Sequence, residues 1–211
     1  MTTPRAAAQT PGRRQRAEMK RTAILDAAEE LFVSSGYETA SVDAIAARAE
    51  VSKRTVYDHF GDKRALFQGV LERCGEALLV TVRASIDQEL VEGRELRDAL
   101  LAFAERMLTE TFRSSIYARF RRLNAQAPPA PRLPEAQRDE PERLLQERFA
   151  ELVAGGELAA TDTYRAVQHF IALTMRLAIE VLDESPAGEV DEAELRALIA
   201  DGVDAFLRAY R

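Results

Sequence analysis

The stretch SVDAIAARAEVSKRTVYDHFGDKRALF, residues 41–67, decides the fold of this chain. Ser41 and Ser52 are good N-caps for two short helices, because a serine hydroxyl accepts a hydrogen bond from a free backbone N–H of the first turn. The turn at 49–52 separates the two helices by only a few residues, and Gly61 ends the second one. Two short helices joined by a tight turn predict a helix-turn-helix.

The second of these helices carries several side chains that can donate hydrogen bonds at a distance from the backbone. They lie at its N-terminal end and on its outer face, and they are Lys53, Arg54, Thr55, Tyr57 and His59. A recognition helix presents such side chains where it enters the major groove of DNA. The segment therefore indicates DNA binding.

The flanking sequence extends this unit in both directions. A helix is expected at about 17–35, because apolar residues recur there at the spacing of one buried stripe. Residues 1–15 contain Pro4, Pro11 and small residues without apolar periodicity, and we interpret them as a mobile basic arm. The DNA-binding domain is thus predicted to span 16–62.

The rest of the chain, 63–211, is predicted to be a helical domain. Unbranched, helix-favouring side chains dominate and strand-like alternation is hard to find, so we expect an all-α protein of about nine helices. The proline-rich stretch APPAPRLP cannot be helical. The expected helices are 63–90, 94–112, 115–125, 139–154, 162–184 and 191–210.

The last two of these helices carry more apolar surface than one chain easily covers. The helix at 162–184 is apolar on more than one face, and that at 191–210 has a broad apolar stripe. Pairing with a second copy as a four-helix bundle would cover both, which predicts a homodimer. The competing interpretation is a buried helix in the core of a monomer.

Charge and composition limit the function classes. The net charge is −6, but residues 1–73 hold 12 Lys and Arg against 10 Asp and Glu, whereas 74–211 hold 17 against 25. An acidic body with a basic front suits a protein that meets a polyanion at one end. Without an apolar run of about 18 residues or a signal peptide, and with Cys74 as the single cysteine, we expect a soluble cytoplasmic protein with no membrane partner.

The decisive stretch resembles the helix-turn-helix of the TetR family of bacterial regulators. The preceding run ILDAAEELFVSSGYETAS is also typical of that family, and the motif resemblance covers roughly 17–67. The positions that match the family pattern are Ser41, Ile45, Ala46, Ala49, Val51, Ser52, Thr55, Tyr57, His59, Phe60, Lys63 and Leu66. One departure is Glu50, where the family usually has glycine, so a positive φ there would strain the turn.

The resemblance implies roles for particular residues. Phosphate contacts fall to Ser41, Tyr57, His59 and Lys63, and contacts with base edges to Lys53, Arg54 and Thr55, with Arg54 suited to guanine. Tyr57 and His59 have a packing role as the alternative. The arm residues that would enter the neighbouring minor groove, or else form a solvated tail, are Arg13, Arg14 and Arg16.

The resemblance also implies that the helical domain, 63–211, serves dimerisation and ligand sensing and contains an effector pocket. Candidate ligand-binding residues are Phe103, Met107, Tyr117, Phe120, Arg121, His169 and Met175, each with an ordinary core role as the alternative. Two isolated histidines and one cysteine form no ligand cluster, so we expect neither a metal nor a cofactor.

The function expected on these grounds is that of a ligand-responsive repressor. Its dimer would bind a palindromic double-stranded DNA operator and would be released by a small-molecule effector. The alternative is a DNA-binding architectural or cell-cycle protein of the same fold without an effector. No phosphate-binding loop, zinc-protease motif or nucleophile elbow is present, so an enzyme is not expected.

Overall fold

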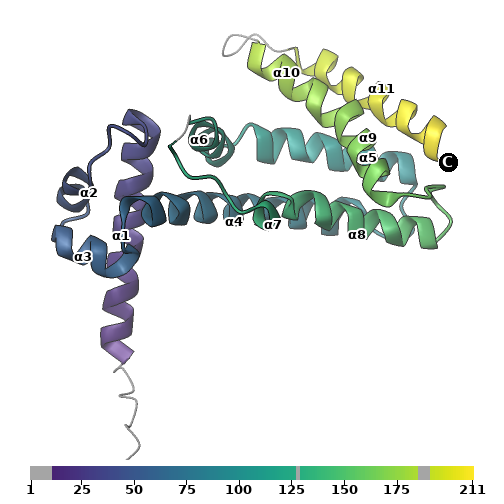
Figure 1. The fold of residues 1–211 in the computed structure, drawn as a ribbon. Helices are drawn as coiled ribbons and strands as arrows, with labels where there is room; N and C mark the ends of the chain where they lie inside the picture. Colours follow the sequence, from purple (N-terminus) through teal and green to yellow (C-terminus); the bar gives the residue numbers. More distant parts are fainter. Residues whose placement is uncertain (1–10, 127–128, 185–190) are drawn as a thin grey trace, which may run out of the picture. The chain divides into compact units, whose positions relative to one another are not determined.

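The computed structural model describes residues 11–126, 129–184 and 191–211, and every regular element in these residues is helical (Figure 1). The all-α prediction is confirmed. The chain divides into two compact units, of which the first contains residues 1–73 and 121–133 and the second contains 74–120 and 134–211. No helix in the described residues is long and apolar enough to cross a membrane.

The first unit is built on three helices and the beginning of a fourth. These are α1 (Pro11–Ser35), α2 (Val42–Arg48), α3 (Lys53–Phe60) and α4 (Lys63–Glu89). The predicted caps are present, since the Ser41 side chain accepts from the Ala44 N–H and that of Ser52 from the Thr55 N–H. Fully buried apolar side chains hold the unit together, among them Ile24, Phe32, Ile45, Leu66 and Phe67.

Helix α1 begins at Pro11, six residues earlier than the expected start at 17. Residues 11–15, which we assigned to the mobile arm, therefore continue the helix. The physical reason is that proline is well suited to the first position of a helix, and the Arg and Gln residues after it favour helical backbone. Residues 1–10 of the predicted arm lie outside the described residues.

A short segment from later in the chain completes the first unit. The side chain of Gln126 accepts a hydrogen bond from the Tyr37 N–H at 2.7 Å and donates one to the Phe32 carbonyl at 2.9 Å. Both partners lie where α1 ends and the chain turns toward α2. The Phe32 carbonyl also accepts from the Gly36 N–H at 3.1 Å, so the amide of Gln126 gives it a second donor and supplies an acceptor to the Tyr37 N–H beyond the end of α1.

The second unit is a helical bundle with a continuous apolar core. Four of its phenylalanines, Phe103, Phe149, Phe170 and Phe206, are almost completely buried, and Phe170 contacts the rings of the other three. After the remainder of α4, its elements are α5 (Leu96–Arg106), η1 (Met107–Phe112), the first part of α6 (Ser115–Asn124), α7 (Glu135–Arg138), α8 (Glu140–Ala154), α9 (Thr163–Ile171), η2 (Ala172–Arg176), α10 (Leu177–Glu184) and α11 (Glu192–Tyr210). Residues 121–124 of α6 belong to the first unit.

Two segments expected to be uninterrupted α-helix contain a π-helical turn. The helix expected at 94–112 ends in η1, and the one expected at 162–184 is divided by η2. At η2 the buried hydroxyl of Thr174 donates to the Phe170 carbonyl at 2.6 Å. Next to it, α11 approaches so closely at Gly202 that an added Cβ would clash with the Leu173 carbonyl. Apolar periodicity cannot report such a one-residue insertion.

Candidate DNA-binding face and effector cavity

Helix α3 is amphipathic across its short length. Val56 is only 2% exposed and faces the core of the first unit, whereas Lys53, Arg54, Tyr57 and Asp58 are exposed. We call these four exposed residues the α3 face; Arg54 and Asp58 lie opposite Val56, and Lys53 and Tyr57 lie on the flanks. A short helix with a buried apolar side and an exposed polar side can present the latter to a nucleic-acid groove.

The charges of the α3 face are partly paired within the protein. The Lys53 ammonium donates to Asp43 of α2 at 2.9 Å, and this hydrogen bond raises the pKa of Lys53. Arg54 has a side chain that is 89% exposed, and its Nε lies 3.9 Å from the carboxylate of Asp58. The Arg54 guanidinium is therefore the more available of the two predicted base-reading cations.

Two of the residues predicted to contact DNA, Ser41 and Thr55, form hydrogen bonds at the N-terminal caps of α2 and α3. The Ser41 hydroxyl caps α2, and the hydroxyls of Thr55 and Ser52 lie 2.8 Å apart. Thr55 is half-buried. The structure thus places Ser41 at the start of α2 and directs Thr55 toward the cap of α3.

Lys63 and His59 lie where α3 ends and α4 begins. The Lys63 ammonium donates to the Glu38 carbonyl at 3.1 Å and lies 4.7 Å from the centre of the Tyr37 ring. His59 is half-buried next to Phe60. Lys63 is a cation positioned by the turn after α1, with donors remaining for an anion.

The predicted arginines of the arm lie on α1. Arg14 and Arg16 are exposed, and Arg13 belongs to the same helix. Sequence reasoning did not single out Arg21, whose guanidinium lies 5.2 Å from the centre of the Phe60 ring. This contact joins α1 to the end of α3, and only its position two helical turns beyond Arg14 hinted at it.

Glu50 adopts the backbone conformation that its position in the family pattern led us to expect. Its φ is +54°, and it is the positive-φ residue other than glycine in the described part of the chain. The left-handed region costs a residue with a Cβ on the order of 1 kcal/mol. The turn of the helix-turn-helix is thus formed with a strained residue in place of glycine.

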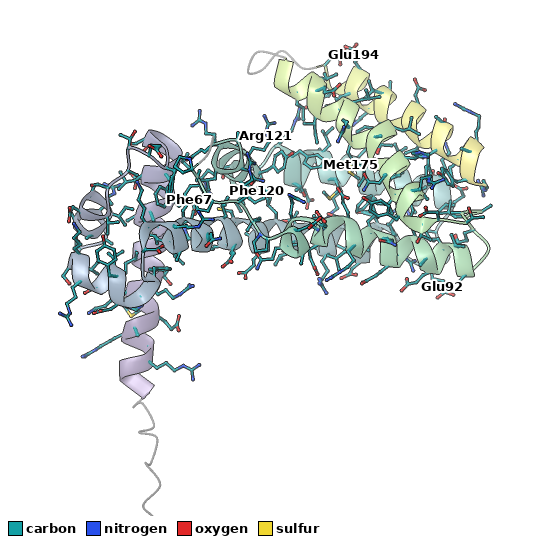
Figure 2. The ribbon with its side chains drawn as sticks, viewed as in Figure 1. Phe67, Glu92, Phe120, Arg121, Met175 and Glu194 are labelled. Atoms are coloured by element: carbon teal, nitrogen blue, oxygen red, sulfur yellow. The ribbon has the colours of Figure 1, made fainter. Side chains whose placement is uncertain are left out.

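The second unit contains a cavity of about 510 Å³. Five of the seven predicted ligand-binding residues line it, and Figure 2 labels two of them, Phe120 on α6 and Met175 on η2. The other three are Phe103, Met107 and Tyr117. A mainly aromatic and aliphatic lining of this size suits a small organic molecule.

Sequence reasoning missed the polar groups of this cavity. Thr111 is 3% exposed, and among the described residues its hydroxyl has the weak acceptor sulfur of Met107 as its partner, at 3.7 Å. Glu142, Arg176 and Glu180 add charge to the lining. Thr111 and Arg176 lie in η1 and η2, so both π-helical turns contribute to the wall. No sequence signal marks the π-helical turns that orient them.

Two predicted ligand-binding residues are not among those that line the cavity. Arg121 follows Phe120 on α6 but is exposed and belongs to the first unit (Figure 2). His169 lies on α9, and its Nδ1 is 2.7 Å from the Tyr210 hydroxyl of α11. Helical spacing gives the residues that share a face, but it does not say which face meets a cavity.

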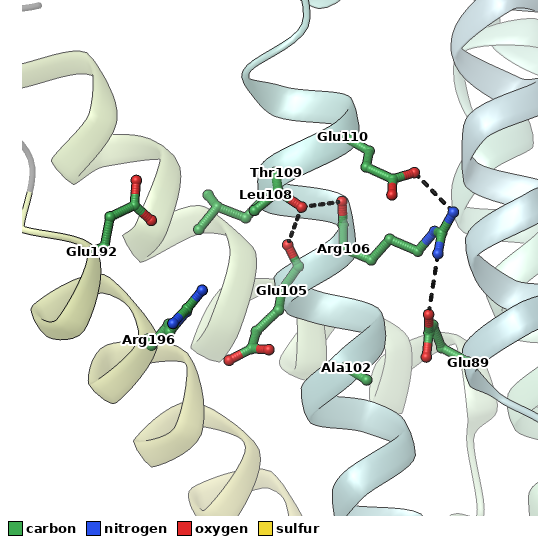
Figure 3. Close-up of a pocket in the computed structure, with 9 residues that line it drawn as sticks. All are labelled: Glu89, Ala102, Glu105, Arg106, Leu108, Thr109, Glu110, Glu192 and Arg196. Atoms are coloured by element: carbon green, nitrogen blue, oxygen red, sulfur yellow. Dashed lines mark hydrogen bonds and ion pairs between the residues drawn. The ribbon is translucent and has the colours of Figure 1, made fainter. Parts of the chain in front are cut away.

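A second, more polar hollow of about 290 Å³ lies in the same unit (Figure 3). Arg106 bridges Glu89 and Glu110 at one side, with nitrogen to oxygen distances of 3.3 Å and 2.9 Å. Glu192 and Arg196 of α11 line the other side. Arg106, Glu89 and Glu110 thus pair with one another, and this hollow offers less apolar surface to a ligand than the first cavity.

Comparisons with known proteins agree with both units. Residues 24–70 match the model of the bacterial regulatory proteins of the tetR family, and residues 98–211 match that of the C-terminal domain of AefR-like transcriptional repressors. The transcriptional activator FasR of Mycolicibacterium smegmatis is 39% identical over 92 residues, which cover 44% of this chain and 42% of that protein. The chain spans less than half the length of the curated relatives it matches.

Solved structures extend the likeness over nearly the whole chain. The flavonoid-responsive regulator FrrA is 28% identical, with a TM-score of 0.71 and coverage of 92% of this chain and 98% of that one. A TetR family regulator from Pseudomonas syringae pv. tomato is 27% identical, with a TM-score of 0.60 and coverage of 92% and 97%. Together with the helix-turn-helix and the α3 face, these matches show that the chain belongs to the TetR family of DNA-binding transcriptional regulators.

Proposed function

We propose that this regulator is a repressor that binds a palindromic operator as a dimer and is released by a small, largely apolar effector. The observation that carries the effector part is the cavity of about 510 Å³, whose lining includes aromatic rings and the nearly buried Thr111 hydroxyl, 3.7 Å from the weak acceptor sulfur of Met107. Burial of apolar ligand surface would supply affinity, and Thr111 would orient the ligand.

The DNA part of the proposal rests on the α3 face. The exposed guanidinium of Arg54 would form a bidentate contact with guanine. The ammonium of Lys53 would contact both Asp43 and the DNA. Tyr57, Lys63 and Ser41 would contact phosphates on either side of the groove, and His59 would do so at the end of α3. The helix-turn-helix domain at 16–62 would thus set register and read sequence.

The cations of α1 would extend this contact. Arg14 and Arg16 are exposed on the first turns of α1, as are all the side chains from 14 to 20. A helical cation row reaches along a phosphate backbone, and with Arg13 it would approach the neighbouring minor groove.

The dimer part rests on apolar surface along the last helices. Leu177 is 43% exposed, and Leu173 and Val181, one turn before and after it, are half-buried. This stripe on η2 and α10 suits the corresponding stripe of a second copy in a four-helix bundle. A dimer would place two α3 faces about 34–36 Å apart, one turn of DNA.

The test of the effector proposal uses the full-length protein, a DNA fragment that it binds, and flavonoids as the first probes, since FrrA responds to this class. Fluorescence anisotropy should show the Kd for DNA rising tenfold or more as the flavonoid saturates the protein. A matched variant, Ile171→Phe, fills part of the cavity and should bind DNA normally while losing the response.

A Kd that stays constant with each flavonoid, together with no thermal stabilisation of the protein, would contradict this effector class. Thermal stabilisation without a change in Kd would contradict release from DNA, because a ligand shifts the equilibrium only through differential affinity for two states.

A further inference from the structure

Asp58 is the acidic member of the α3 face. Its side chain is 66% exposed and lies one helical turn beyond Arg54. Three other acids of the first unit have closer partners: Asp43 pairs with Lys53 at 2.9 Å, Glu30 with Arg48 at 2.6 Å, and Asp62 accepts from the Ala65 N–H at 2.7 Å. Among the described residues the ionic partner of Asp58 is Arg54, at 3.9 Å and without a hydrogen bond. Its carboxylate oxygens therefore remain available as acceptors.

A carboxylate on a surface that approaches DNA finds few groups there with which it can interact favourably. Phosphates repel it, so it contributes nothing to affinity from the backbone. In the major groove, guanine presents two acceptors and thymine an acceptor and a methyl group, neither of which suits an acceptor-only side chain. Adenine offers one donor beside an acceptor. Cytosine offers its N4 amino group as a donor, which matches Asp58 best.

The geometry of α3 allows Arg54 and Asp58 to read different base pairs. Residues four apart on a helix are separated by about 6 Å along its axis, compared with about 3.4 Å between successive base pairs. Arg54 and Asp58 share one side of α3 and carry opposite charges, so the groove must offer them opposite hydrogen-bonding groups. A guanine and a cytosine within about two steps meet this requirement.

We propose that Asp58 is a specificity-determining residue, which accepts a hydrogen bond from a cytosine amino group near the guanine read by Arg54. This proposal rests on the major-groove docking of α3 proposed above. Binding to DNA that lacks this cytosine should be weaker, because the Asp58 carboxylate is then removed from water without gaining a hydrogen-bond donor from a base.

The experiment is selection from a pool of randomised duplex DNA, performed in parallel with the wild type, Asp58→Ala, Asp58→Asn and Arg54→Ala. The wild type should select a half-site with guanine and cytosine at two close positions, and should prefer that cytosine about tenfold over other bases. Asp58→Ala should lose the preference at this position alone. Asp58→Asn should move it toward adenine, for which an amide is suited.

Glu76→Gln serves as the matched control, because it removes an exposed carboxylate of α4 that lies outside the first unit. It should select the wild-type sequence, and Arg54→Ala should lose the guanine while keeping the cytosine. If the wild type and Asp58→Ala select the same sequence, Asp58 does not determine specificity, and the DNA-binding proposal still stands. The same conclusion follows if Asp58→Ala binds all sequences more tightly by the same factor. Failure of the wild type to select any sequence would overturn both.

Discussion

The two units of this chain differ in where their polar chemistry lies. In the first unit the functional groups are on the outside: α3 buries Val56 and exposes Arg54 and Asp58. In the second unit they are inside, where Thr111 lines a cavity beneath aromatic rings. An exposed face depends on a short segment and its caps, whereas a cavity depends on how several helices pack. Variants should therefore affect the two units in different ways.

The largest effect is expected from Gly202→Ala in the second unit. Because the added Cβ meets the Leu173 carbonyl, α11 and η2 must move apart, which costs about 3 kcal/mol of unfolding free energy. Urea unfolding followed by circular dichroism measures this. Gly155→Ala is the control, since its Cβ would have its nearest neighbour at 3.5 Å and should change stability little. Equal stability of the two variants would refute the close packing at Gly202.

Next in size is the effect of Arg54→Ala on DNA binding. Loss of a bidentate contact with guanine should weaken binding to the selected sequence by about 2 kcal/mol, with unchanged unfolding free energy, because the side chain is exposed. Anisotropy titrations at one salt concentration measure the Kd. Arg83→Ala removes the same charge from an exposed position of the second unit and should bind like the wild type. A similar loss in both variants would indicate a general charge effect.

Gln126→Ala should destabilise the first unit by about 1–2 kcal/mol. It removes two hydrogen bonds and takes the side-chain acceptor from the Tyr37 N–H, while the Phe32 carbonyl keeps the Gly36 N–H as its donor. Hydrogen exchange at the end of α1 should accelerate, while exchange in α11 should not. The exposed Gln137 of α7 provides the comparison, and Gln137→Ala should leave both rates unchanged. Faster exchange throughout the second unit would mean that the two units do not unfold separately.

The smallest effect is a gain. Glu50→Gly should stabilise the first unit by about 0.5–1 kcal/mol, because glycine adopts a positive φ without strain, partly offset by its greater freedom in the unfolded chain. The thermal unfolding midpoint of the variant checks the sign. The control variant Glu76→Gln also removes one negative charge, but from an exposed position within α4, and should leave the unfolding midpoint unchanged. A lower midpoint for Glu50→Gly would show that the Glu50 side chain contributes more than its backbone costs.

Sequence reasoning predicted the first unit closely and the second only in outline. Ser41, Ser52 and Gly61 define α2 and α3 through local caps, so their bounds were predictable within about a residue. The π-helical turn at η2 and the close approach at Gly202 depend on contacts between helices distant in the sequence. Asp58 was overlooked because the family pattern leaves its position open, and exposure alone identifies it.

The central claim is that this regulator controls a small number of promoters by reading a palindrome through α3. Mapping its binding sites across its own genome, by immunoprecipitation of the wild type and of Arg54→Ala, tests this most directly. The account predicts a few sites that share an inverted repeat with half-sites one helical turn apart, all lost in the variant. Many scattered sites without a shared sequence, equally occupied by both proteins, would contradict it and favour an architectural role.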